Sequence, residues 1–312
     1  MTGLHVGVAL EGYGWHPEAW RQADALPVAG GRYWSDLVAT AERGLLDFVT
    51  FDDSLSPQRR RRPDIEPRWL AGRPDAVLLA AHVAPATRHI GLIPVVIATH
   101  AQPSCIVKSL AALHDVSKGR AGWQVRISSA PHEAALFGRQ EHAADLFADA
   151  ANTVAAVRES WDSPGGPPVV TALAHNLGVY EFASDSADLV FITPKGDEAV
   201  GSILAEVADA GGRHLQVYAD IYVTFGGVVD KRSDAEVFDG TPNELAEKIS
   251  RWHELGLAGV RLRPAVAAAD LPVIVDEVVP LLQRDNGFRT NYDPGETLRQ
   301  RLGLGLGLER TP

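Results

Sequence analysis

The stretch SKGRAGWQVRISS, residues 117–129, reads as a turn that runs into a β-strand. Two glycines punctuate its first half, and apolar and polar residues alternate in its second half. The alternation divides it into two sets, which are Trp123, Val125 and Ile127, and Gln124, Arg126 and Ser128. Successive strand side chains point to opposite faces, and a half-buried strand usually turns its polar set to water. The place of Arg126 therefore depends on the fold around this strand.

Eight short apolar runs of this kind alternate with eight segments of helical periodicity. The predicted strands cover residues 4–10, 47–51, 89–97, 122–128, 168–172, 188–192, 215–224 and 258–262. The predicted helices cover residues 33–43, 75–84, 103–116, 141–160, 176–184, 196–210, 243–255 and 271–283. Thr241 and Pro242 suit the cap and first turn of the seventh helix. Eight strand–helix units predict an α/β fold, the (β/α)8 TIM barrel, over residues 1–312, with a C-terminal extension from about residue 284.

A doubly wound sheet is the rival architecture. The stretch after the first strand, ALEGYGWHP, lacks the G-x-G-x-x-G turn that opens a dinucleotide-binding helix in such folds, which favours the barrel. Segments 11–32 and 52–74 then become long loops at the carboxyl ends of strands, where barrel enzymes build their sites. The segment RLGLGLGLERTP, which ends the sequence, is expected to be a surface extension or a contact with a partner.

Composition narrows the class of function. The chain has 312 residues, 46% of them hydrophobic, and a formal net charge of −11. This acidic balance argues against sequence-independent binding of nucleic acid. The single cysteine, Cys105, excludes a disulfide within the chain. The sequence contains no signal peptide pattern and no apolar run of about 20 residues, so we expect a cytoplasmic protein that does not enter a membrane.

A barrel would turn the polar face of residues 122–128 into its lumen. Arg261 and Arg263 share a strand face, and Asp220 lies on the polar face of residues 215–224. A buried arginine keeps its charge and requires a carboxylate or an anionic ligand, and Asp220 is the candidate partner. Two interpretations stay open: Arg126, Asp220 and Arg261 form an internal ion-pair network, or Arg126 contacts a ligand.

The sequence gives less support to metal binding, to nucleophilic catalysis and to acid catalysis by a histidine. The eleven histidines show no metal-binding spacing, and no G-x-S-x-G nucleophile elbow is present. His100 is a candidate general acid because histidine titrates near neutral pH, although an ordinary loop histidine has the same appearance. The run of arginines at 59–62 is typical of a solvated segment, or would attract an anionic substrate if it lay beside a site.

Several longer stretches carry a family resemblance. Residues 31–55 (GRYWSDLVATAERGLLDFVTFDDSL), residues 98–129, and residues 240–262 and 278–304 in the C-terminal part resemble the bacterial luciferase-like flavin monooxygenases. The branch that they resemble contains nitrilotriacetate monooxygenase and dibenzothiophene-sulfone monooxygenase. The resemblance implies a (β/α)8 barrel, reduced FMN supplied by a separate NAD(P)H-dependent flavin reductase, and oxygen activation through a flavin C4a-peroxide. It also implies a homo-oligomer.

The resemblance also implies roles for particular residues. Asp53, Thr99 and Gln124 match positions beside the flavin ring, although Gln124 replaces an asparagine that is one methylene shorter. The pattern around His16 implies that three loop residues line the substrate pocket, namely Trp15, His16 and Trp20. Each of these residues also has an ordinary structural interpretation as a cap, a turn or a packed aromatic side chain.

The phosphate turn of the family is altered in this sequence. Residues 172–178 read ALAHNLG, with Leu173 in place of a glycine and His175 in place of a serine. Phe147 falls near a tyrosine that reaches the phosphate in the family. His175 and Asn176 remain as phosphate donors beside a helix N-terminus. The sequence therefore predicts an FMN-dependent monooxygenase acting on a small organic molecule. The alternatives are a deazaflavin-dependent oxidoreductase and a non-catalytic paralogue that has lost flavin.

Overall fold

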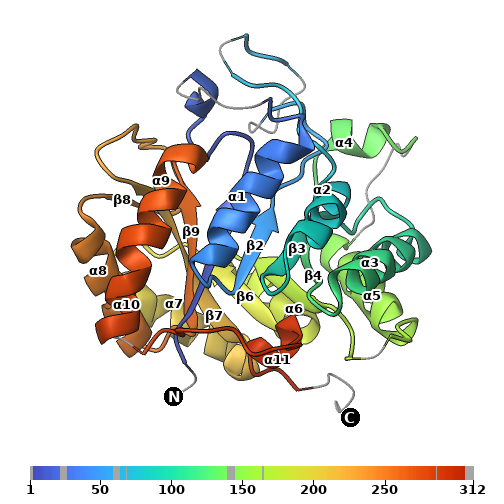
Figure 1. The fold of residues 1–312 in the computed structure, drawn as a ribbon. Helices are drawn as coiled ribbons and strands as arrows, with labels where there is room; N and C mark the ends of the chain where they lie inside the picture. The colour runs from blue at the N-terminus through green and yellow to red at the C-terminus, as the bar shows by residue number, and fades with distance from the viewer. Residues whose placement is uncertain are drawn as a thin grey trace.

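A closed barrel of eight parallel strands forms the centre of the molecule (Figure 1). The computed structural model describes residues 3–21, 27–58, 64–67, 69–138, 145–163, 165–285 and 287–305. The barrel strands are β1 (His5–Leu10), β2 (Phe48–Phe51), β3 (Gly91–Ile97), β4 (Gly122–Arg126), β5 (Val169–Leu173), β6 (Leu189–Ile192), β7 (Gln216–Thr224) and β9 (Gly259–Pro264). Strand β7 pairs with β6 and β9, and β9 pairs with β1, which closes the sheet. The predicted TIM barrel is confirmed.

Helices surround the barrel and cover its apolar outer face (Figure 1). The longer ones are α1 (Gly31–Arg43), α2 (Ala76–Val83), α3 (Pro103–Ser117), α5 (Leu146–Glu159), α6 (Leu177–Ser186), α7 (Asp197–Asp209), α8 (Pro242–Glu254), α9 (Ala267–Val273) and α10 (Val279–Asp285). The short ones are α4 (Pro131–Ala135), α11 (Leu298–Arg301) and the 3₁₀ turns Ala19–Arg21, Ala84–Ala86 and Gly212–His214. Helix α8 begins as predicted, because Thr241 and Glu244 form a reciprocal capping box.

Three predicted segments differ from the structure. The helix predicted to begin at residue 271 begins at Ala267, where the Asp270 carboxylate accepts the Val266 N–H at 2.7 Å, and it passes through a π turn (Ile274–Val278). The segment between the predicted strand 215–224 and the predicted helix 243–255 contains a strand that was not predicted, β8 (Glu236–Asp239), which pairs with the carboxyl half of β7. Helix α5 begins at residue 146, and residues 141–144 of the predicted helix lie outside the described residues.

The turn before β4 is held by a buried arginine. Arg120 donates to the carbonyl oxygens of Ser117 at 2.7 Å, Ile90 at 2.8 Å and Ala84 at 2.9 Å, which satisfies helix-end carbonyls. Gly119 has a φ of 83°, a conformation that favours glycine. The turn thus positions β4 so that Trp123 packs among the outer helices and Gln124 enters the lumen.

The lumen has an apolar lower layer and a polar layer above it. In the lower layer the rings of Phe48, Phe191 and Tyr218 contact one another, with centroids 5.8–6.1 Å apart. Arg261 lies directly on this layer, with its guanidinium carbon 3.6 Å from the Phe191 ring centre. Barrel interiors are usually filled by branched apolar side chains, so a charged layer at this height marks the start of the site.

The C-terminal segment closes the amino-terminal end of the barrel, below the strands in Figure 1. Leu298 and Leu302 pack into the lower lumen layer beside Phe48. Arg289 donates to the buried Asp47 carboxylate at 2.5 Å, and Tyr292 donates to a backbone carbonyl at 2.6 Å. The expectation of a surface extension is therefore wrong for Arg301 and Leu302, which are buried, whereas Gly303 and Gly305 are exposed and residues 306–312 lie outside the described residues.

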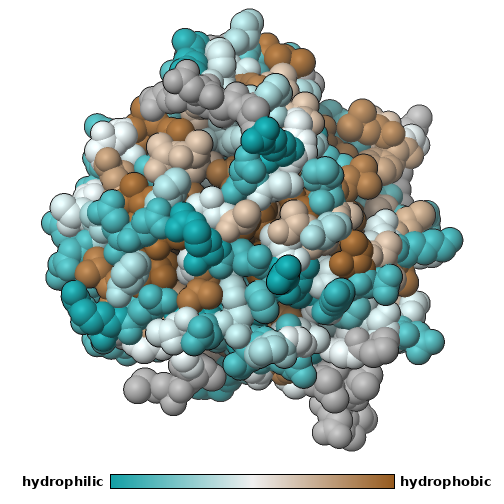
Figure 2. All heavy atoms as spheres, viewed as in Figure 1, coloured by the Kyte–Doolittle hydropathy of each residue, from teal (hydrophilic) through white to brown (hydrophobic). Residues whose placement is uncertain are grey.

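The surface is mixed in polarity. Figure 2 shows hydrophilic residues over most of one face, with hydrophobic residues gathered at the upper right, where α4 lies in Figure 1. Leu136 and Phe137, just after α4, are 66% and 45% exposed. Within the described part of the chain, no helix is both long enough and apolar enough to span a membrane.

We expect Asp47→Asn to lower the free energy of unfolding by about 2 kcal/mol at pH 7. Burial raises the pKa of Asp47, but His5, Arg289 and the Val6 N–H outweigh this effect and lower that pKa from 3.8 to about 2. A carboxyl group with a depressed folded-state pKa stabilises the fold above its unfolded-state pKa. That contribution is lost as the pH falls through the folded-state pKa.

Urea unfolding of both proteins between pH 7 and about pH 3 measures this effect, and the difference between them should shrink toward acid. Asp276→Asn is the matched control, because Asp276 pairs with Arg43 at the exposed surface and should change stability little. A difference that is the same at both ends of the pH range would contradict the assignment.

We also expect Leu298→Ala to lower the free energy of unfolding by about 2–5 kcal/mol, because it opens a cavity under the barrel. Leu298 is fully buried, whereas Leu255 is 44% exposed, so Leu255→Ala should cost less than about 0.5 kcal/mol. Equal midpoints of chemical unfolding for the two variants would show that the C-terminal segment is not part of the core.

Candidate active site

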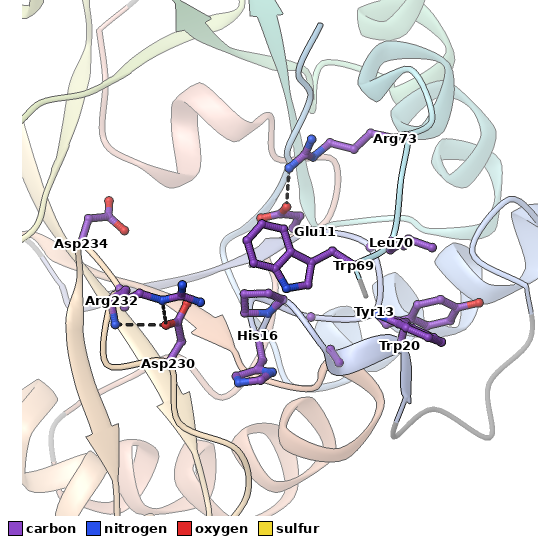
Figure 3. Close-up of a pocket in the computed structure, with 16 residues that line it drawn as sticks. Glu11, Tyr13, His16, Trp20, Trp69, Leu70, Arg73, Asp230, Arg232 and Asp234 are labelled. Carbon is purple, nitrogen blue, oxygen red and sulfur yellow. Dashed lines mark hydrogen bonds and ion pairs between the residues drawn. The ribbon is translucent and has the colours of Figure 1, made fainter. Parts of the chain in front are cut away.

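Three loops enclose a cavity of about 310 Å³ at the carboxyl end of the barrel (Figure 3). The loops follow β1, β2 and β7, and the first two are the long loops that the sequence singles out. Of the predicted substrate residues, His16 and Trp20 line the cavity. Trp15 does not: its indole N–H donates to the Ala9 carbonyl at 2.8 Å, and the Arg263 guanidinium stacks 4.3 Å from its ring centre.

The predicted flavin residues lie beyond this cavity, at the ends of β2, β3 and β4. Asp53 accepts the N–H groups of Ser54 at 2.6 Å and Ala76 at 3.1 Å, so its carboxylate holds the turn after β2 against the start of α2. Burial raises the pKa of Asp53 more than these hydrogen bonds lower it. Thr99 accepts the Ser128 N–H at 3.1 Å and joins the loops after β3 and β4.

Gln124 is oriented by a buried ion pair. The Arg261 guanidinium donates to both oxygens of Asp220 at 2.6 Å, and its Nη1 donates to the Gln124 carbonyl oxygen at 2.5 Å. Arg261 and Asp220 are at most 2% exposed. Because the amide oxygen of Gln124 accepts from Arg261, the NH2 group of Gln124 is the part of its amide that can donate to a ligand. Within the described residues this NH2 group makes no hydrogen bond.

Arg126 belongs to a different cluster from the one considered in the sequence. It donates to the Asp53 carbonyl oxygen and lies 3.8 Å from the Asp52 carboxylate. Asp52 is also 3.3 Å from Arg73, which donates to Glu11 at 2.6 Å. The predicted ion-pair network of Arg126, Asp220 and Arg261 is therefore wrong in one residue. Asp220 pairs with Arg261 and with Arg263, and not with Arg126.

The altered phosphate turn lies at the start of α6. Asn176 caps this helix by accepting the Val179 N–H at 3.3 Å, and His175 Nδ1 is 3.0 Å from the Thr193 hydroxyl oxygen. Phe147 packs against Phe182 beside Gly178. His175, Asn176 and the first helical residue are exposed, so this helix begins at the surface, where its first N–H groups have no intrahelical partner.

Asp234 connects this turn to the cavity. Its carboxylate lines the cavity, accepts from Arg263 Nη1 at 2.7 Å and lies 3.7 Å from His175 Nε2. Burial raises the pKa of Asp234, but the charges of Arg263 and His175 outweigh it and lower that pKa to about 2. Asp234 is therefore ionised at neutral pH and stands between the cavity and the phosphate turn.

A hydrogen-bonded latch joins the loops after β2 and β4. The buried Glu133 carboxylate accepts from the hydroxyls of Ser56 and Ser128, each at 2.5 Å. Burial raises the pKa of Glu133, but the hydrogen bonds from the two serines and the charge of Arg126 outweigh this effect and lower that pKa.

His100, which the sequence presents as a candidate acid, is buried and stacks on Phe137 with ring centres 5.3 Å apart.

The sequence pattern did not identify several residues of the site. Those that line the cavity or support its wall are Glu11, Asp52, Trp69, Arg73, Asp230, Arg232 and Asp234. All lie in loops after strands. The sequence singles out the loops after β1 and β2 but not the loop after β7, and loop sequence carries no period that assigns a side chain to a cavity. In the described ranges, no three or more histidine, cysteine or acidic side chains are placed to hold a metal ion.

Comparisons with known proteins agree with this geometry. The family model for luciferase-like monooxygenases matches residues 15–237. Nitrilotriacetate monooxygenase component A of Aminobacter aminovorans is 33% identical, and the alignment covers 96% of each chain. Dibenzothiophene-sulfone monooxygenase of Rhodococcus erythropolis is 31% identical over 92% of this chain and 93% of its own. The solved structure of an EDTA monooxygenase from Chelativorans sp. BNC1 has a TM-score of 0.86 at 17% identity, covering 97% of this chain and 99% of that one.

The relatives are longer than this chain. The alignment with the nitrilotriacetate enzyme spans 440 positions, more than the 312 residues present here, so the relative has residues without a counterpart. The alignment nevertheless covers 96% of this chain. By the match to its family model and by the identity with these relatives, the chain belongs to the luciferase-like monooxygenase family.

Proposed function

We propose that this protein is a reduced-FMN-dependent monooxygenase of a two-component system that oxygenates a small organic substrate. One observation carries the proposal: two chains of ion pairs link the cavity to the residues predicted to hold flavin. Arg73, Asp52 and Arg126 form the first chain, and Asp234 with His175 forms the second. A substrate in the cavity would thus lie beside a flavin at the ends of β2 to β5.

The donors at these strand ends suit a flavin with a phosphate tail. The amide NH2 group of Gln124 offers a hydrogen bond to an acceptor on the ring edge. Thr171, opposite Gln124 on β5, is fully buried, and its hydroxyl has no hydrogen-bond partner among the residues that the structure describes. At the other end, His175, Asn176 and the start of α6 offer donors to a phosphate. The family serine and tyrosine are absent, so we expect weaker phosphate binding than these relatives would show.

Bound reduced flavin would supply the electrons that activate molecular oxygen. The protein would orient the ring through Gln124, whose amide is held by the Arg261–Asp220 pair. Arg126 acts as a positioning residue, since its guanidinium holds the Asp52–Asp53 turn. We assign His100 as the proton donor, because it lies next to Thr99 on the loop after β3 and a histidine can exchange protons near pH 7.

Reduced flavin must come from a partner protein, since the proposal gives this chain no reductase function of its own. The name of the nitrilotriacetate relative, component A, supports a second component for that enzyme. By the same reasoning we propose an NAD(P)H-dependent flavin reductase as the partner here, and a homo-oligomer as the working state.

Titration with oxidised FMN, reduced FMN and a deazaflavin tests the assignment of the cofactor. We expect tighter binding of reduced FMN, and substrate-dependent oxygen consumption only when a flavin reductase and NAD(P)H are added. Preference for the deazaflavin would replace the proposal with a deazaflavin-dependent oxidoreductase. Failure to bind any of the three would leave a non-catalytic paralogue.

We expect Gln124→Leu to weaken binding of reduced FMN by roughly three- to tenfold, the worth of one hydrogen bond. The change removes the ring-edge donor and leaves Arg261 paired with Asp220. Fluorescence titration under anaerobic conditions measures the dissociation constant, and Gln283→Leu, on the outer helix α10, is the matched control. Unchanged affinity in Gln124→Leu would remove Gln124 from the flavin site.

We expect the double change His175→Ala and Asn176→Ala to weaken FMN binding by about tenfold or more and riboflavin binding by much less. Riboflavin lacks the phosphate, so the ratio of the two dissociation constants isolates the phosphate contacts from any general loosening of the helix start. A ratio equal to that of the unmodified protein would place the phosphate elsewhere.

A further inference from the structure

We propose that the cavity binds an uncharged, ring-bearing molecule through a single hydrogen-bond acceptor, such as a carbonyl or sulfonyl oxygen, and that Arg73 donates to that acceptor. The inference deepens the proposed function, on which it rests for the role of this molecule as substrate. It predicts weaker binding of polycarboxylates, the class that appears in the names of two relatives.

Aromatic side chains give the cavity its walls. Figure 3 shows Trp69 at the centre of the cavity, with Tyr13 and Trp20 on one side and His16 below. Trp69 is only 9% exposed, and Gln58 donates to its backbone carbonyl at 3.3 Å, which holds the loop in place. Flat rings pack well against such walls, and each buried aromatic pair contributes beyond its area.

Arg73 supplies the unused donor. Its Nη2 donates to Glu11 and its Nε faces Asp52, so one edge of the guanidinium is occupied. Within the described residues neither Nε nor the remaining nitrogen, Nη1, makes a hydrogen bond, and both belong to a side chain that is only 8% exposed and lines the cavity. A buried N–H without a partner is costly, so a ligand oxygen that reaches Nη1 is favoured.

Charge selects against an anionic ligand. The described residues of the wall include two arginines and three carboxylates, which are Arg73, Arg232, Glu11, Asp230 and Asp234. Each arginine already has a carboxylate partner, with Arg232 3.5 Å from Asp230. Asp234 is held by Arg263 from below. A polycarboxylate would therefore bring several charges into a partly closed space that offers no uncommitted cation among these residues.

His16 completes the arrangement. Its Nδ1 accepts the Glu18 N–H at 3.1 Å, so the neutral ring carries its proton on Nε2. In this tautomer His16 adds a polar edge to the cavity without adding charge.

The run of arginines at 59–62, which the sequence presents as a segment that would attract an anionic substrate, lies outside the residues that the structure describes.

Three probes separate the possibilities, namely 1-tetralone, tetralin and nitrilotriacetate. The first two share a bicyclic skeleton and differ by one carbonyl oxygen, and the third is a polycarboxylate. Equilibrium dialysis of the full chain in sealed cells, without flavin, measures each dissociation constant. We expect 1-tetralone to bind tighter than both other probes. Tighter binding of either tetralin or nitrilotriacetate would overturn the assignment.

The variant Arg73→Lys tests the donor itself. Lysine keeps a charge for Glu11 but loses Nη1, so the ratio of the tetralin constant to the 1-tetralone constant should fall about tenfold. Arg43→Lys is the matched control, because Arg43 pairs with Asp276 on the outer surface, and its ratio should stay at the unmodified value. An unchanged ratio in Arg73→Lys would reject Arg73 as the donor.

Two further measurements keep the outcome interpretable. Trp69→Leu should weaken both bicyclic probes by similar factors and leave their ratio intact, because it removes the wall and not the donor. A parallel FMN titration separates the two proposals: FMN binding without ketone preference defeats only the substrate class, and ketone preference without FMN binding defeats only the proposed cofactor.

Discussion

The buried carboxylate of Asp220 is the group on which the rest of the site depends. It lies in the barrel lumen, where it neutralises Arg261 and Arg263 together. Two guanidinium groups in an apolar interior would otherwise carry a large desolvation cost, and neither can lose its proton. Removing the carboxylate would leave two like charges beside each other, so Asp220 allows a polar layer to exist above the aromatic one.

Each of the two arginines orients side chains in a different part of the candidate site. Arg261 reaches across the lumen and fixes the amide of Gln124, which sets the donor offered to a cofactor. Arg263 reaches outward, stacks on Trp15 and holds Asp234 at the edge of the cavity. The same buried charge therefore orients the predicted flavin contact and one wall of the substrate cavity, although these lie on different strands and loops.

The sequence was sufficient for the barrel and for the inward direction of its polar faces. Alternation places Gln124, Arg126 and Asp220 in the lumen, and all three lie on lumen-facing strand positions. Alternation does not give the stagger between strands, which decides the height of each side chain along the barrel axis. Arg126 stands two residues beyond Gln124 and so meets Asp52 in a higher layer. The alternation of polar and apolar residues therefore could not predict which of these side chains form ion pairs with one another.

The same limit applies to the loops and to the C-terminal segment. Trp15 and Trp20 are indistinguishable in sequence, yet one packs under Arg263 and the other lines the cavity, because the loop path is set by contacts with distant segments. Leu298 and Leu302 look like parts of an exposed tail until the open end of the barrel is considered. A barrel whose lower layer consists of large rings leaves apolar surface at that end, and this surface explains why the tail is buried.

The ion-pair chains also connect the cavity to the residues predicted to hold flavin. Arg73 stands between Glu11 and Asp52, and Asp52 stands between Arg73 and Arg126, which holds the backbone at Asp53. Charge along this chain is balanced, so a ligand that binds Arg73 through a neutral oxygen leaves it intact. A carboxylate ligand would compete with Asp52 and Glu11 for the same guanidinium and would loosen the turn that supports the predicted flavin residues. In the proposed site, one chain of contacts would thus influence both the charge of the substrate and the orientation of the cofactor, and a neutral ligand is the class that leaves this chain intact.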